Sequence, residues 1–521
     1  MPVDFPLTWT TSKSAVRGNR GMVAAQHQKA AEVGAEILRA GGNAIDAAIA
    51  TSLALAVVEP WMSGLGGGGF MNIAKADGRG EILDFGMIAP QALDTSAYPL
   101  RGDRDNDLFG WPAVLDDRNV MGPLSIAVPG QAAGLGLAFE RHASMPWRDL
   151  CGPAIRLAED GLPVDWHSSL LITTAAADLR RFETGASHFL PDGVPPLPDI
   201  GGAATFRPTP ALATTLRRLA EAGPDDLVSG ELAKVLVDDV RNAGGVLDLE
   251  DLASHAARVV DPVQHDHGDA QIRVPGGLTA GPTLAHTLDL IAGKINTGNP
   301  SPEAYVAWAD ALFAAYEHRL DNLGHAAETD SGRAGCTTHL CVLDAEGNMV
   351  SLTQTLLSLF GSKIQSPRTG ILLNNGIMWF DPRPGGPNSM APGKRPLSNM
   401  CPVIASRHGA PWLTIGASGG RRIMPAVMQI TSMMIDSGLD LESAFHTPRI
   451  DVSGGPAVLA DRRLSAEART ALEARHPTRE VASMVWPKLF ACPSAIARDP
   501  HTGEAFGMTD PVQPAAGVAA A

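Results

Sequence analysis

The sequence predicts a protein of mixed α/β class, and two observations carry this prediction. Alanine-rich helical periodicity dominates before about residue 320, and strand-like alternation clusters after it. Hydrophobic residues make up 45% of the 521 residues, so the chain can bury a large core. The length is compatible with one large α/β body or with roughly two to four domains.

Three segments of the first part have the pattern of helices. Residues 28–40 form a helical run that ends at a Gly-Gly pair, a common helix stop. Residues 44–58, the most apolar window, are too few to span a bilayer and predict a buried helix. A third run covers residues 304–320. The glycine run at 64–69 lacks the Gly-Lys-Ser/Thr ending of a phosphate-binding loop, so we expect a tight turn between approaching layers.

Strand patterns follow in the second part, near residues 338–355, 370–374, 402–406 and 411–416. The first of these predicts a β-hairpin with a turn centred on Glu346. Thr337 and Thr355 are equally distant from that centre, so they should face each other with their Cβ atoms roughly 5 Å apart. A bulge would shift this register by one residue.

The threonine pair permits two interpretations. It can be an ordinary cross-strand pair, which is common in sheets. Alternatively, Thr337 is a nucleophile. A threonine hydroxyl needs an adjacent base, and a free α-amino group on the same residue, with a pKa of about 7.7 to 8.0, can serve. An internal threonine acquires that group only if the chain is cut before it.

Several motifs occur in a fixed order along most of the chain. They are Gly41-Gly42-Asn43-Ala44-Ile45-Asp46-Ala47-Ala48, Val57-Val58-Glu59-Pro60, Gly64 to Phe70, Thr337-Thr338-His339-Leu340, Gly347-Asn348, Thr353-Gln354-Thr355-Leu356, Phe360-Gly361, Gly370 to Asn375, Gly393-Lys394-Arg395-Pro396-Leu397-Ser398 and Gly416-Ala417-Ser418-Gly419-Gly420 followed by Arg422-Ile423. Together they resemble the γ-glutamyltransferase family of N-terminal-nucleophile hydrolases.

The resemblance implies a fold and a mechanism. The fold would be α+β, a four-layer αββα sandwich with two antiparallel sheets between helices. The precursor would cut itself between Cys336 and Thr337, giving a large subunit 1–336 and a small subunit 337–521. Thr337 would then attack an amide carbonyl, Thr355 would orient it, and the backbone N–H groups of Gly419 and Gly420 would hold the oxyanion.

Other positions depart from the family pattern and bear on the substrate. In place of the family's Asp-Phe-Arg-Glu run the chain has Asp84-Phe85-Gly86-Met87, so the arginine that binds an α-carboxylate is missing. Leu357 and Trp379 replace an asparagine and an aspartate that bind the charged end of the substrate, and Gly376 replaces a glutamine. Of the family's serine pair, Ser398 remains and Asn399 replaces the second.

These replacements predict a drier acyl pocket that favours an acyl group without an α-ammonium. An arginine elsewhere, such as Arg368 or Arg421, could still supply a contact for an anion. The Pro/Gly-dense segment 381–396 joins Trp379 to Ser398 and could cover the site as a lid. Only residues 321–336 separate the third helix from Thr337, which is short for the family.

Three functions remain open from the sequence. The leading one is a self-processing amidohydrolase or acylase that acts on a non-γ-glutamyl amide, with water or an amine as acceptor. The second is a γ-glutamyl hydrolase or transferase, and the third is an inactive binding protein of the same shape. Retention of the residues at 337, 355, 419 and 420 disfavours the third.

Composition bounds the partners and the location. The net charge of -15 disfavours nucleic-acid binding. The five cysteines have no metal-like spacing and predict no disulfide framework, so no metal or cofactor is expected. The first twenty residues lack an uninterrupted apolar segment of the secretory type, and no membrane partner is expected. We therefore expect a cytoplasmic enzyme.

Overall fold

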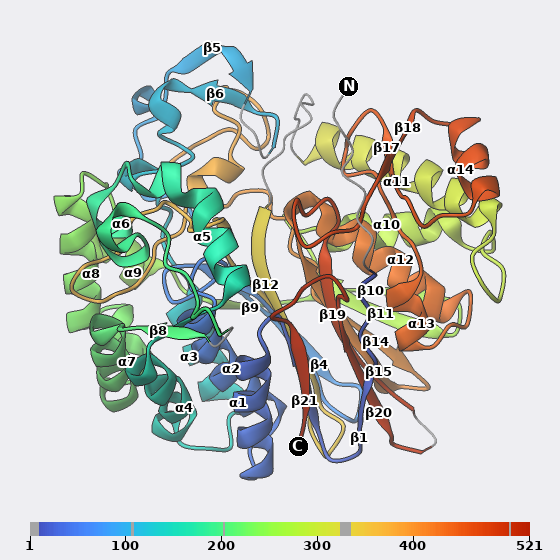
Figure 1. Ribbon diagram of the computed structural model, residues 1–521, viewed down its shortest axis with the longest axis horizontal. Coiled ribbons are helices and arrows are strands. Elements are labelled where there is room, and N and C mark those ends of the chain that lie inside the picture. Colours follow the sequence, from blue (N-terminus) through green and yellow to red (C-terminus); the bar gives the residue numbers. More distant parts are fainter. Residues whose placement is uncertain (1–9, 106–108, 202–203, 324–334, 500–501) are drawn as a thin grey trace.

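The structure is a computed structural model of the 521-residue chain, and it describes residues 10–105, 109–201, 204–323, 335–499 and 502–521. Two seven-stranded sheets lie next to each other in the middle of the molecule, and helices cover the outer face of each (Figure 1). The expected four-layer αββα sandwich is therefore confirmed. Most of the short segment before Thr337, residues 324–334, lies outside the described residues.

Every neighbouring pair of strands in both sheets is antiparallel. Sheet 1 has the order β1 (Val16–Gly18), β20 (Ala505–Thr509), β19 (Cys492–Arg498), β15 (Ala410–Ser418), β14 (Val403–Arg407), β11 (Ala270–Pro275), β10 (Pro262–His267). Sheet 2 has the order β21 (Gly517–Ala520), β2 (Met22–Ala25), β12 (Gly335–Leu343), β13 (Met349–Ser358), β3 (Gly68–Ala74), β4 (Gly80–Phe85), β9 (Arg258–Val260). Both sheets combine strands from before and after residue 336, so the two predicted subunits would form one body.

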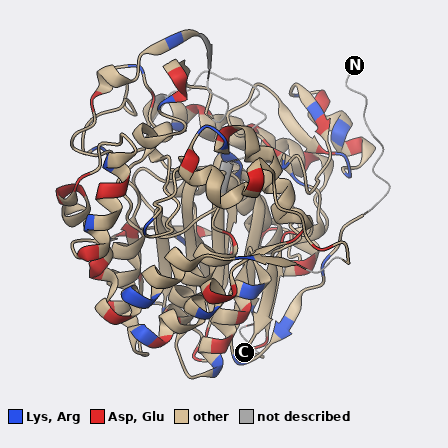
Figure 2. Cartoon of the chain, turned by 60° about the vertical axis from the view of Figure 1, so that its left-hand side comes forward, with Lys and Arg blue, Asp and Glu red and all other residues tan. Residues whose placement is uncertain are grey.

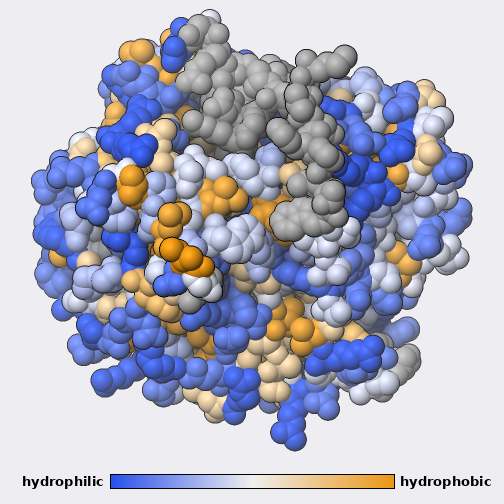
Figure 3. Space-filling view, viewed as in Figure 1, coloured by the Kyte–Doolittle hydropathy of each residue, from blue (hydrophilic) through white to orange (hydrophobic). Residues whose placement is uncertain are grey.

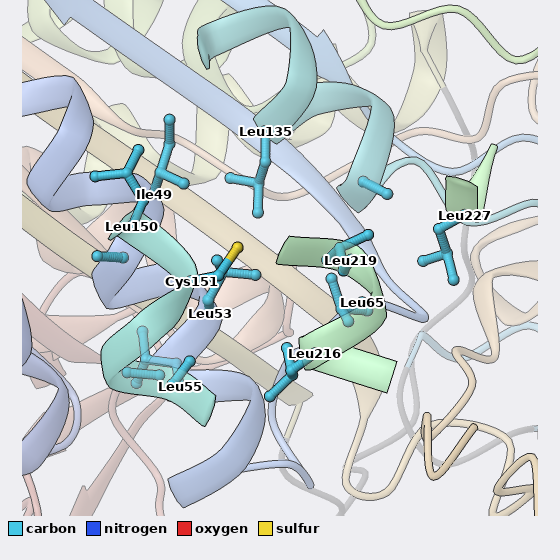
Figure 4. Close-up of a cluster of buried hydrophobic side chains, with 14 of the residues drawn as sticks. Ile49, Leu53, Leu55, Leu65, Leu135, Leu150, Cys151, Leu216, Leu219 and Leu227 are labelled. Atoms are coloured by element: carbon cyan, nitrogen blue, oxygen red, sulfur yellow. The ribbon is translucent and has the colours of Figure 1, made fainter. Parts of the chain in front are cut away.

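A helical layer packs on the outer face of sheet 2. Its buried core contains side chains from α1 (Gln28–Arg39), α2 (Ala44–Val58), α3 (Gln131–His142), α4 (Trp147–Asp160), α7 (Pro210–Ala222), α8 (Glu231–Asn242) and α9 (Leu249–Ser254). In Figure 4, leucines of α2, α3, α4 and α7 converge in this core. Helix α2 is buried along its whole length, as its uniformly apolar sequence predicts.

A second helical layer covers sheet 1. It contains α10 (Gly281–Ile291), α11 (Pro302–Asn322), α12 (Ile423–Ile435), α13 (Leu441–His446) and α14 (Ala466–Glu473). The remaining elements are α5 (Trp166–Leu179), α6 (Glu183–Phe189), the pairs β5 (Leu100–Asp105) with β6 (Pro112–Val114) and β7 (Leu162–Val164) with β8 (Thr205–Arg207), and a small sheet of β16 (Ile450–Asp451), β17 (Val458–Asp461) and β18 (Thr478–Val481).

Most of the expected elements are present. The three predicted helices correspond to α1, α2 and α11, and the hairpin corresponds to β12 and β13. The strand expected at 370–374 is wrong, because this segment makes only isolated bridges from Leu372 to Gln365 and from Leu373 to Gly66. Backbone bonds from the Leu373 N–H to the Ile364 carbonyl oxygen and from the Asn374 N–H to the Gly66 carbonyl oxygen hold the segment, and the Asn374 side chain adds bonds to the carbonyl oxygens of Gly66 and Ala127.

Charged residues lie mainly on the outer helices and loops, whereas the strands between them carry few (Figure 2). On the face in Figure 3, hydrophilic side chains cover both flanks, and hydrophobic ones form separate small groups. Among the described residues, no helix combines the length and the apolar character that crossing a bilayer requires.

Candidate active site

The strand that carries Thr337 is irregular at that residue. From Thr338 to Leu343 the hairpin register is the predicted one, with Thr338 opposite Gln354. The register then shifts, because Cys336 lies opposite Leu357. Two residues of β13, Thr355 and Leu356, therefore face the single residue Thr337. Bulges of this kind redirect side chains and are frequent beside active sites.

The bulge brings the two threonine hydroxyls together. Thr337 Oγ1 and Thr355 Oγ1 are 3.2 Å apart, and both side chains are buried. Thr355 Oγ1 also accepts a hydrogen bond of 2.8 Å from the backbone N–H of Leu357. Leu357 has a φ of 87°, an unfavourable value for a branched side chain. The Thr355 hydroxyl thus links a strained backbone turn to the hydroxyl of Thr337.

The glycine run before β3 allows the backbone to approach Thr355 closely. Gly68 pairs with Thr355 in register. A Cβ at any of four consecutive glycines would overlap a backbone carbonyl oxygen, in turn that of Leu372, Thr355, Phe85 and Thr353 for Gly66, Gly67, Gly68 and Gly69. The tight turn predicted from the sequence is present at residues 64–67, where the Gly67 N–H bonds the Gly64 carbonyl oxygen at 3.0 Å, whereas Gly68 and Gly69 are the first residues of β3.

Two buried titratable groups lie near the hairpin. His339 contacts Thr353 Oγ1 and Cys341 Sγ, and burial lowers the pKa of His339 to about 3, so it stays neutral. Glu59 accepts a 3.2 Å hydrogen bond from Thr338 Oγ1, and burial raises the pKa of Glu59 to about 8. Sequence reasoning missed Glu59, although it lies in the quoted Val-Glu-Pro motif.

Gly419 and Gly420 lie where β15 ends and a short 3-10 turn leads into α12, and this turn packs against β12. Their φ values are 139° and 63°, in the region that favours glycine. Within the described part of the chain, neither N–H has a hydrogen-bond acceptor. Two open donors close to the strand of Thr337 suit the predicted oxyanion role.

Three of the predicted substrate residues line one cavity. Gly86, Trp379 and Ser398 share a space of about 270 Å³ with Phe70, Met87, Met400 and other residues. Ser398 Oγ accepts a bond of 3.2 Å from the Met400 N–H. The Trp379 carbonyl oxygen accepts a bond of 2.7 Å from Asn388, which anchors the loop 381–396 that was expected as a lid.

The other two predicted substrate residues, Leu357 and Asn399, are not among the residues that line this cavity. Leu357 packs in the same buried cluster as Phe70, Met87 and Trp379. Asn399 accepts a 3.3 Å hydrogen bond from the buried Arg319. Their expected contact with substrate stays a prediction.

The same cavity contains two arginines that sequence reasoning did not place there. Arg258 bonds one carboxylate oxygen of Asp84 at 2.7 and 2.9 Å. Arg395 lies 3.4 Å from the other oxygen and 3.2 Å from the carbonyl oxygen of Gly86. Arg395 was visible only as part of a family motif, and Arg258 had no sequence signal. Because of these two arginines, the cavity is more polar than the apolar replacements in the sequence predict.

The arginines considered from the sequence have other roles in the structure. Arg368 pairs with Asp239 at 2.6 Å. Arg421 lies over the rings of Phe109 and Trp111 and bonds the Phe109 carbonyl oxygen. Neither is among the residues that line the cavity of Gly86 and Trp379. No group of three or more potential metal ligands occurs among the described residues.

Two antiparallel sheets between helical layers, with a buried threonine on a central strand, match the architecture of the hydrolases that use an N-terminal nucleophile. A family model described as Gamma-glutamyltranspeptidase matches residues 30–332 and 324–520. The chain therefore belongs to the gamma-glutamyltranspeptidase family.

Its relatives include acylases and hydrolases made as proenzymes. The chain is 33% identical to "Acylase ACY 1 proenzyme" of Pseudomonas sp. (strain SE83), over 100% of this chain and 98% of the relative. It is 30% identical to "Glutathione hydrolase proenzyme" of Escherichia coli (strain K12), over 95% and 91%. The solved structure of cephalosporin acylase from Bacillus halodurans superposes with a TM-score of 0.86, at 26% identity over 100% of this chain and 99% of that one.

Proposed function

We propose that the protein is a self-processing acylase in which Thr337 is the nucleophile. The observation that carries this proposal is the 3.2 Å contact between the hydroxyls of Thr337 and Thr355 at a bulge. The acylase relatives, which match the chain over its whole length, support the reaction class.

The peptide bond proposed to be cut, between Cys336 and Thr337, lies within β12 (Gly335–Leu343). In the proposed processing step, Thr337 Oγ1 loses its proton and attacks the carbonyl carbon of Cys336. The bond from that carbon to the Thr337 nitrogen breaks as the nitrogen takes up a proton, so an ester replaces the peptide bond and the α-amino group becomes free. Water then hydrolyses the ester, which releases the Cys336 carboxylate and restores the Thr337 hydroxyl. The products are the large subunit 1–336 and the small subunit 337–521.

The new amino group then serves as the base for catalysis. It takes the proton from Thr337 Oγ1 as the oxygen attacks the substrate carbonyl, and it returns the proton to the leaving amine. The N–H groups of Gly419 and Gly420 stabilise the oxyanion, a contribution worth about 10²- to 10³-fold in rate per donor. Water then hydrolyses the acyl ester. His339, which contacts Thr353 Oγ1 and Cys341 Sγ, is assigned no role in this proposed step.

The substrate is proposed to be an amide whose acyl group lacks an α-ammonium. Supporting residues are Gly86, Leu357 and Trp379, which stand where the family has an arginine, an asparagine and an aspartate that bind the charged end of a γ-glutamyl group. A γ-glutamyl hydrolase is the second candidate, favoured by the 30% identity to the Escherichia coli glutathione hydrolase proenzyme. Transfer to an amine acceptor and a cytoplasmic location stay predictions.

The test has two parts. Purified protein is resolved on a denaturing gel, and the smaller band is sequenced from its N-terminus. We expect two bands, with the smaller one beginning at Thr337, and an uncut, inactive chain for Thr337→Ala. Rates on a γ-glutamyl anilide and on simple acyl anilides then separate the two candidates. A single uncut wild-type chain after long incubation contradicts the proposal.

A further inference from the structure

Glu59 contacts the strand that carries the proposed nucleophile. Its carboxyl group accepts a 3.2 Å hydrogen bond from the hydroxyl of Thr338, the residue after Thr337. Both partners of this bond are buried, with at most 1% of each residue exposed. We infer that Glu59 is a positioning residue, which acts through Thr338 to hold the start of β12 in the orientation that Thr337 needs for self-cleavage and catalysis. This inference rests on the proposed function, in which Thr337 is the nucleophile.

Two nearby residues of the same chain segment hold the opposite strand, β13. The Ser63 hydroxyl accepts a bond of 2.9 Å from the side chain of Gln354, and the Met62 carbonyl oxygen accepts a bond of 3.0 Å from the N–H of Leu356. Gln354 and Leu356 are the residues on either side of Thr355. One short segment therefore binds neighbours of both threonines, on the two strands that meet at the bulge.

Helix α2 fixes the position of Glu59. The N–H of Ala44, the first residue of α2, donates a 3.0 Å bond to Asp344, the residue directly after β12. Glu59 is the C-cap of the same helix. The 15 residues of α2 span about 22 Å, and the chain from Thr338 to Asp344 spans about 20 Å. The helix therefore runs antiparallel to β12 and is bonded near both ends of the strand.

The surroundings of Glu59 favour its neutral form. Burial raises the pKa of Glu59 to about 8, and the charge of Lys488 and the bond from Thr338 oppose this effect only in part. Burial lowers the pKa of His167, on which the charge of Lys488 also acts, to about 3, and it lowers the pKa of His339 on β12 to the same value. Both histidines therefore stay neutral at pH 6 and above. Ionisation of Glu59 near pH 8 would bury a charge, which is costly, and should draw its side chain toward Lys488 and away from Thr338.

The first test measures the rate of self-cleavage on a denaturing gel after brief cell-free synthesis. Glu59→Leu removes the acceptor of the Thr338 hydroxyl, so we expect cleavage to be about 10-fold slower, whereas Glu59→Gln keeps an acceptor and should retain most of the rate. Thr338→Val removes the donor and should slow cleavage by a similar factor, and Glu59→Leu added to it should have little further effect. The matched control is Thr51→Val, which removes a buried hydroxyl that bonds Ala47 within the same helix and should leave the rate unchanged.

The pH dependence of self-cleavage separates positioning from packing. The uncut precursor has no α-amino group on Thr337, so that group does not contribute to the profile. We expect the wild-type rate to fall above about pH 8, where Glu59 ionises, and the Glu59→Gln rate to show no such fall. In the processed enzyme, Glu59→Leu should lower kcat on an anilide and leave KM unchanged, because Glu59 does not line the cavity of Gly86 and Trp379.

The outcomes distinguish this inference from the proposed function. If the wild-type chain is cut at Thr337 while Glu59→Leu and Thr338→Val are cut at the same rate, only the positioning role is wrong. It is also wrong if the effects of these two changes multiply in the double variant, or if wild type and Glu59→Gln have the same pH profile. The profile decides the matter if Glu59→Leu does not fold.

Hydrogen exchange provides a measurement that does not depend on cleavage. In the uncut variant Thr337→Ala, the added change Glu59→Leu should speed the exchange of backbone amides at the start of β12, and Thr51→Val should not. If the wild-type chain stays uncut but this difference is observed, the contact stands and the proposed function fails. Equal exchange with and without Glu59→Leu overturns the inference.

Discussion

Thr355→Val tests whether the threonine pair is a catalytic arrangement or ordinary sheet packing. Valine has nearly the shape of threonine, so the change removes the hydroxyl and leaves the packing. The change removes the 3.2 Å contact with Thr337 Oγ1 and the 2.8 Å bond from the Leu357 N–H. The first loss affects the orientation of Thr337, and the second leaves a buried donor without an acceptor.

The expected magnitudes follow from these two contacts. A buried N–H without a partner costs about 1–3 kcal/mol, and Leu357 also loses the bond that holds its φ of 87°. A nucleophile displaced by about 1 Å loses roughly 10²-fold in rate. We therefore expect Thr355→Val to slow both self-cleavage and turnover by about 10²-fold, and to lower the free energy of unfolding by about 1–3 kcal/mol.

The assays are the appearance of the small subunit on a gel, kcat on an anilide, and urea unfolding. The control is Thr431→Val, which removes a buried hydroxyl without a hydrogen-bond partner among the described residues. It should leave cleavage and kcat unchanged. Thr355→Ser keeps the hydroxyl and should retain most of the activity. If Thr355→Val loses stability but cleaves and turns over like wild type, Thr355 is a packing residue only.

Three further predictions follow from the same region. Thr337→Ser should still cut and turn over, because it keeps the hydroxyl, and a variant that stays uncut on a gel would argue against hydroxyl attack. In Gly67→Ala the new Cβ overlaps the Thr355 carbonyl oxygen, so we expect the free energy of unfolding in urea to fall by about 1–3 kcal/mol and self-cleavage to become slower. Self-cleavage at the wild-type rate would show that this turn does not affect the catalytic threonines. Burial raises the pKa of Glu59 from 4.5 to about 8, so its stabilising effect is complete below pH 4.5 and is lost as the pH rises toward 8. In Glu59→Gln the free energy of unfolding in urea should depend less on pH between 5 and 8 than in the wild-type protein. The same pH dependence in both proteins would refute the raised pKa of Glu59.

Local pattern was sufficient for much of the fold. The limits of α1 and α2 follow from a Gly-Gly stop, a capping asparagine at 43 and an apolar run, all of which are local signals. The hairpin followed from alternation around one turn. The strand predicted at 370–374 failed because a local pattern does not show whether a partner strand runs alongside, and here only single bridges to Gln365 and Gly66 form.

The candidate site likewise has parts that the local sequence predicts and parts that it does not. Thr337 and Thr355 belong to one hairpin, so their equal distance from the turn predicts that they face each other. The bulge at Thr337, which determines how the two side chains meet, does not follow from that distance. The cavity depends on residues from β4, β9 and the loop 381–396, which are close only in the folded chain. Arg258 and Asp84 are 174 residues apart, and no local pattern predicts their ion pair.

Gly86 and Arg395 both contact Asp84. The Gly86 N–H donates to Asp84 Oδ1 at 3.0 Å, and Arg395 lies 3.4 Å from the same oxygen and 3.2 Å from the Gly86 carbonyl oxygen. A Cβ at Gly86 would lie 3.3 Å from both Asp84 Oδ1 and the Phe70 ring, which is a tight contact on two sides. An arginine at position 86, as in the family pattern, would therefore require Asp84 or Phe70 to shift. The packing around Asp84 thus suits the glycine, and the preference for an acyl group without an α-ammonium stays a prediction.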